Sequence, residues 1–123
     1  MIQAYSTNVT VAADAPVPFN NVSTKKGCTA VLSGTSTIEL NKAGVYMVEF
    51  DGVAGTATTV QLYRDGVAQP QAQSTGTVLG FTTLVQVDRN NTACCCTSPV
   101  TLKLQNTTAA TFDNANVVVT KVC

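Results

Sequence analysis

Apolar and polar residues alternate in short runs along the whole chain, and turn-forming residues separate these runs. The clearest run covers residues 44–50, where Tyr46, Val48 and Phe50 lie on one side of an extended chain. The 20 threonines and 18 valines favour pleated sheet over helix, because branching at Cβ restricts the side chain in a helix. The pattern predicts an all-β protein, a sandwich or a barrel, with about 8–10 antiparallel strands.

The segments that carry the strand pattern are residues 2–5, 9–12, 29–32, 37–40, 44–50, 58–63, 81–88, 100–105 and 117–122. Asp65-Gly66 follows the segment 58–63 closely and is a strong signal for a tight hairpin. We interpret residues 69–80 as an edge strand or a wide loop, and both 89–99 and 106–116 as loops.

Low charge indicates that part of the surface is covered by further copies of the chain. Only 11% of the residues are charged, against about 25% in ordinary soluble domains, while 45% are hydrophobic. The run Val117-Val118-Val119 has no outward polar partner, so we expect that strand to be covered on both faces, the second cover being another subunit. Seven basic and seven acidic residues cancel, which argues against nucleic acid or an anionic membrane as the main partner.

Composition also argues against an enzyme. The chain has no histidine, which excludes the Ser-His-Asp and Cys-His arrangements and removes the usual general base near neutral pH. Glu49 and Asp51 are two residues apart and could form a carboxylate pair, but we favour Glu49 on an outer face and Asp51 at the start of an Asp-Gly turn. No acidic cluster of the kind that binds calcium is present. We expect no catalytic residue, no cofactor and no metal.

The order of several motifs adds a resemblance to this picture. They are Pro18-Phe19, Gly27-Cys28-Thr29, the continuous segment 38–50, the segment 60–66 that ends in Asp65-Gly66, Leu102-Lys103-Leu104-Gln105-Asn106, and the segment 117–122. From about residue 9 to residue 122 the chain resembles the trimeric jelly-roll superfamily of complement globular heads and tumour-necrosis-factor-like domains. It is similar above all to the bacterial and phage branch, which includes small virion proteins and the C-terminal domains of spore-surface collagen-like glycoproteins.

The resemblance implies a jelly-roll homotrimer. Five residues would then lie near the trimer axis or in the domain core: Tyr46, Val48, Phe50, Val117 and Val119. Residues 1–15 would be an N-terminal arm or first strand, able to pair with the sheet edge of an attachment partner, and residues 16–123 the jelly-roll domain.

The five cysteines are Cys28, the run Cys94-Cys95-Cys96, and Cys123. Their odd number and spacing fit neither a disulfide framework nor a zinc site, so we expect reduced thiols. The alternative places three copies of the Cys94–Cys96 run near a three-fold axis, where they would form inter-chain disulfides or a thiolate metal site. Cys123 could meet its symmetry mates or Cys28.

The function implied is that of a non-enzymatic structural protein on a phage virion, either a capsid decoration or a short head or tail fibre. Its partners would be further copies of itself and a capsid or tail protein. A second hypothesis is a tip that binds a host-surface protein or glycan through the loops 69–80, 89–99 and 106–116, whose one aromatic residue is Phe112. A third is the globular head of a spore or cell-surface fibre. Residues 1–19 lack the features of a signal peptide, so we expect synthesis in the host cytoplasm.

Overall fold

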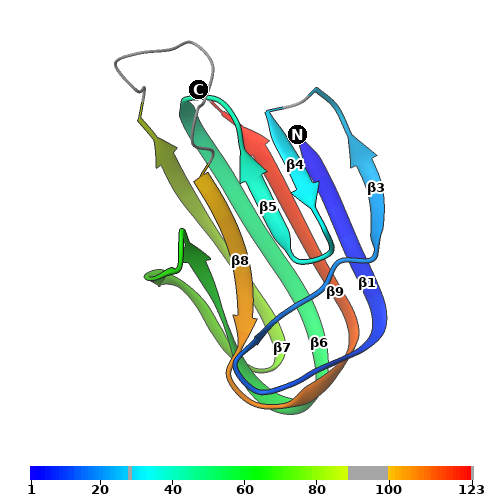
Figure 1. The fold of residues 1–123 in the computed structure, drawn as a ribbon. Helices are drawn as coiled ribbons and strands as arrows, with labels where there is room; N and C mark the ends of the chain where they lie inside the picture. Colours follow the sequence, from blue (N-terminus) through cyan, green and yellow to red (C-terminus); the bar gives the residue numbers. More distant parts are fainter. Residues whose placement is uncertain (28, 89–99, 123) are drawn as a thin grey trace.

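The computed structural model describes residues 1–27, 29–88 and 100–122 (Figure 1). Within these ranges the chain forms strands and turns, and it has no helix that could cross a membrane. The strands are β1 (Ile2–Val11), β2 (Ala15–Pro16), β3 (Asn21–Lys25), β4 (Ala30–Ser33), β5 (Thr37–Leu40), β6 (Gly44–Arg64), β7 (Val67–Val87), β8 (Val100–Asn106) and β9 (Ala110–Lys121). The predicted all-β architecture is therefore confirmed.

Two long strands, β6 and β7, connect two layers of antiparallel sheet. The first part of β6 pairs with β9, for example Val48 with Val119, whereas its last part pairs with β8, for example Leu62 with Leu104. β7 follows β6 through both layers. The first layer has the order β3-β1-β9-β6-β7, and the second has the order β4-β5-β8-β6-β7, with the short β2 beside β8. The result is a jelly-roll sandwich (Figure 1).

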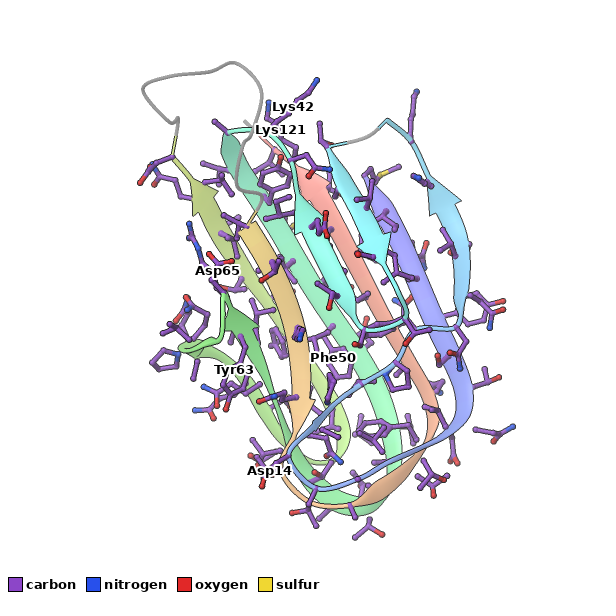
Figure 2. All side chains as sticks on the ribbon, in the orientation of Figure 1. Asp14, Lys42, Phe50, Tyr63, Asp65 and Lys121 are labelled. Atoms are coloured by element: carbon purple, nitrogen blue, oxygen red, sulfur yellow. The ribbon has the colours of Figure 1, made fainter. Side chains whose placement is uncertain are left out.

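The core fills the space between the layers with alternate residues of the paired strands. Tyr46, Val48, Phe50, Val117 and Val119 are all fully buried there. Figure 2 shows Phe50 in the interior, and its ring lies 5.8 Å from that of Phe81. Pairs of this kind add stability beyond the area they bury.

The structure corrects the interpretation of residues 106–116 as a loop. Asn106 ends β8, and β9 begins already at Ala110. Phe112, which we expected on a binding loop, has no exposed surface and belongs to the core. The many Asn, Thr and Asp residues here suggested a loop, but burial of alternate apolar side chains keeps the chain extended.

The prediction of a turn at Asp51-Gly52 is also wrong, because both residues lie inside β6. Gly52 lies in a tightly packed position and not in a turn: a Cβ there would lie 3.1 Å from Cζ of Phe50 and 3.3 Å from the carbonyl oxygen of Asn114. For residues 69–80 the edge-strand alternative is right, since they belong to β7. The tight turn after β6 is confirmed, with Asp65 and Gly66 at φ values of 49° and 82°, both in the left-handed region that such hairpins need.

The N-terminal segment forms β1, whose two edges pair with β3 and β9. Ile2 and Ala4 are fully buried, so this segment is an integral strand of the first layer. An attachment role for residues 1–15 stays a prediction, and it would have to use exposed side chains because the backbone of β1 is already paired. β3 escaped the sequence interpretation because all five of its residues are exposed, which leaves no alternating pattern to find.

A buried polar network ties β8 to its neighbours at one end of the sandwich. Asn106 is fully buried; its amide nitrogen donates to the carbonyl oxygen of Val11 at 3.3 Å, and its Oδ1 accepts a hydrogen bond from Thr58 Oγ1. Thr58 Oγ1 also lies 3.1 Å from the carbonyl oxygen of Thr108. Each polar atom is satisfied, as low-dielectric surroundings require.

Replacing Asn106 with leucine is expected to lower the free energy of unfolding by about 1–3 kcal/mol. The change keeps the volume but leaves the Val11 carbonyl and the Thr58 hydroxyl without this partner. Urea denaturation at fixed protein concentration measures the effect. The exposed change Thr107→Ala is the control, and an equal stability of the two variants would show that the network contributes nothing.

Candidate functional site

The outward side of the first layer carries an unusual number of apolar side chains. In antiparallel sheets one face normally packs on the core and the other is polar. Here seven apolar residues point away from the core, and we call this set the apolar face. They are Tyr5, Val45, Met47, Val53, Val78, Leu84 and Val118.

Strand pairing places these residues next to one another. Met47 lies opposite Leu84, and Val53 lies opposite Val78, on adjacent strands. The two side chains of each pair are close enough to form a local apolar surface, and polar rows separate the two pairs along the strands. Val78 is 77% exposed and Leu84 is 61% exposed. Large exposed apolar side chains on a sheet are typical of surfaces that bind other proteins.

The run Val117-Val118-Val119 was expected to be covered on both faces, and the single chain covers one of them. Val117 and Val119 face the core and are fully buried. Val118 points to the opposite side, lies between Gln3 and Glu49, and is only half-buried. The second cover that this strand was expected to have is therefore not supplied by the chain itself.

Glu49 and Asp51 both project from β6 onto the apolar face. Glu49 lies between Val118 and Thr82, and Asp51 lies between Asn116 and Gly80. A Cβ on Gly80 would lie 3.1 Å from Asp51 Oδ1, so glycine leaves room for this carboxylate. These neighbours include no second acid-base group and no cation that would make the pair a catalytic site.

The outer edge of the first layer is also open. Among the described residues β7 pairs only with β6, and residues 78–87 contain no charge, no proline and no register shift. Charges, prolines and register shifts are the features by which natural edge strands avoid further pairing. The other edges have them: β4 has four residues, β3 ends at Lys25, and the first part of β7 contains Pro70 and an irregular register.

The predicted site residues thus divide into two groups. Tyr46, Val48, Phe50, Val117 and Val119 lie together in the core, on the inner side of the strands that present the apolar face. Cys28, Cys94, Cys95, Cys96 and Cys123 lie outside the described residues, so the thiol hypothesis stays a prediction. The described residues contain no group of side chains suited to a metal ion. Met47, Leu84 and Val78 were not predicted as a surface site, since the outward positions of 44–50 and 78–87 also include Glu49 and Thr82.

Comparison with known proteins identifies the fold. No protein-family model and no curated protein matches the chain. The globular domain of zebrafish complement 1qA protein matches with a TM-score of 0.75 and 10% identity, over 99% of this chain and 96% of that one. Rabbit GITRL matches with a TM-score of 0.64 and 10% identity, over 100% of this chain and 95% of that one. The vertex protein P5 of PRD1 matches with a TM-score of 0.63 and 14% identity, over 99% of this chain and 96% of that one.

These structures cover almost the whole of both chains. The protein therefore has the same jelly-roll fold as these complement-head, GITRL and vertex-protein structures, as the motif order indicated. Identities this low define the fold, and the function has to be argued from the surface.

Proposed function

We propose that this protein is a non-enzymatic structural protein that assembles as a homotrimer on the surface of a phage virion. The apolar face is the observation that carries the proposal. It holds seven outward apolar residues on the same four strands whose inner side forms the core. Covering such a face with further copies removes apolar surface from water and explains the low charge of the chain.

A ring of copies fits two different contact surfaces better than a two-fold dimer does. A two-fold interface uses the same patch on both partners, whereas a cyclic ring joins one patch to a different patch of the next copy. The apolar face and the adjacent open edge at residues 78–87 supply two such patches. Three copies close the ring in the superfamily that the motif order resembles.

The virion location is supported by the fold of a virion component. The vertex protein P5 of the phage PRD1 matches this chain over nearly its full length. A capsid decoration and a short head or tail fibre both fit a small trimer without catalytic groups. The globular head of a spore or cell-surface fibre is the competing proposal, since the same fold would serve there.

Quantitative peptide mass spectrometry of gradient-purified particles tests the location. We expect peptides of this chain in the particles. Calibrated against the major capsid protein, the number of copies per particle should be a multiple of three. Peptides found on purified spores or cell envelopes and absent from particles would contradict the virion proposal and favour the fibre head.

A further inference from the structure

The outward side of the second layer differs chemically from the apolar face. Here the side chains that point away from the core are mostly amides and hydroxyls. We call five of them the glutamine face: Gln61, Tyr63, Gln73, Lys103 and Gln105. If the trimer covers the first layer, the outward side of the second layer stays open to solvent. The inference below rests on the proposed function only for this access.

Strand pairing arranges the glutamine face in two rows, and the pairing of β6 with β7 shifts register between them. Gln61 lies opposite Gln73 on one side and Gln105 on the other, which puts three amides in one row across three strands. The next row contains Tyr63, with Lys103 opposite it on β8. Neighbouring strands are about 4.8 Å apart, so these groups form one continuous surface.

Part of the glutamine face is held in position by the backbone. Gln61 Nε2 donates to the carbonyl oxygen of Gln69 at 3.3 Å, which directs its Oε1 away from that contact. The amide groups of Gln73 and Gln105 and the Tyr63 hydroxyl have no hydrogen bond to other described residues. They remain available as donors and acceptors for a ligand.

The composition of the face selects the class of ligand. Lys103 is its one charged member, which is too little basic charge for nucleic acid. It also lacks the apolar centre that protein interfaces have. Hydroxyl groups match amide donors and acceptors, and the partly buried Tyr63 offers an aromatic ring for the apolar side of a sugar ring.

From these observations we propose that the glutamine face binds an uncharged polysaccharide, with a sugar ring stacked on Tyr63 and hydroxyl groups bonded to the glutamine row. Figure 2 shows Tyr63 on the outer side, next to the β6–β7 hairpin that carries Asp65. The sequence placed a glycan site on end loops, whereas this surface lies on the sheet. Phe112, the aromatic residue of those loops, is in the core and cannot contribute.

Affinity electrophoresis of the full chain in native gels tests this inference. The gels contain dextran, mannan or galactan as neutral probes and alginate as an anionic probe. We expect at least one neutral probe to retard the protein, and Tyr63→Leu to weaken that binding about tenfold while keeping apolar bulk. Tyr63→Phe keeps the ring and should bind within about threefold of the unmodified protein.

The matched control is Asn20→Ala, which removes an exposed amide between β2 and β3, outside both faces, and should leave retardation unchanged. Gln61→Ala, in the central row, should weaken it. No retardation by any neutral probe, retardation by alginate alone, or equal binding by Tyr63→Leu and Tyr63→Phe would overturn the inference. Light scattering on the same samples separates this failure from a failure of the trimer, since either property can be lost alone.

Discussion

Leu84→Asp is expected to turn the assembled protein into a folded monomer. Leu84 is 61% exposed in the single chain, so the change should leave the fold intact. In the assembly it would place an unpaired carboxylate in an apolar contact beside Met47. Burying such a charge costs several kcal/mol, which lowers the association constant by roughly three orders of magnitude or more. Analytical ultracentrifugation over a range of concentrations measures this.

Gln73→Asp is the matched control for that change. Gln73 lies on the same strand and is also exposed, but it belongs to the second layer, so the two variants carry the same new charge on different surfaces. The control should sediment like the unmodified protein. If Leu84→Asp remains fully associated, or if Gln73→Asp dissociates as readily, the apolar face is not the interface.

Phe50→Ala is expected to lower the free energy of unfolding by about 3–5 kcal/mol. The side chain is fully buried, packs against the ring of Phe81 and lies close to the Cα of Gly52. The tight contacts of β6 with its neighbours prevent the surrounding strands from closing the cavity. Denaturant titration should be run at one protein concentration, because the stability of an assembling protein depends on it.

Val67→Ala supplies the comparison for the core variant. Val67 is 63% exposed at the β6–β7 hairpin, and its truncation should change stability by no more than about 0.5 kcal/mol. If Phe50→Ala lowers the free energy of unfolding no more than Val67→Ala does, Phe50 does not anchor the core.

Local alternation predicted most strands, because it reports which side of each strand is buried. Residues 37–40 were predicted with the bounds that β5 has, and Tyr46, Val48 and Phe50 were predicted on one side of their strand, the side that is buried. What local pattern could not show is that β6 continues from Gly44 to Arg64 without a loop. Asp51-Gly52 suggested an interruption, but the strand passes between two layers there, and only tertiary pairing keeps it extended.

The functional surfaces were harder to predict than the fold, for a physical reason. Alternation shows that Met47 and Leu84 lie opposite the buried side of their strands, but not that they lie opposite one another. The same holds for Gln61, Gln73 and Gln105, which form one row only through the register of three strands. Register is a long-range property, so neither surface exists in any single segment of sequence.

Native mass is the measurement that tests the central claim most directly. Light scattering on a size-exclusion column, with and without reductant, should give three times the chain mass of 12.8 kDa in both conditions. A trimer that disappears with reductant would assign the assembly to the cysteines and not to the apolar face. A stable monomer in both conditions would contradict the proposed assembly altogether.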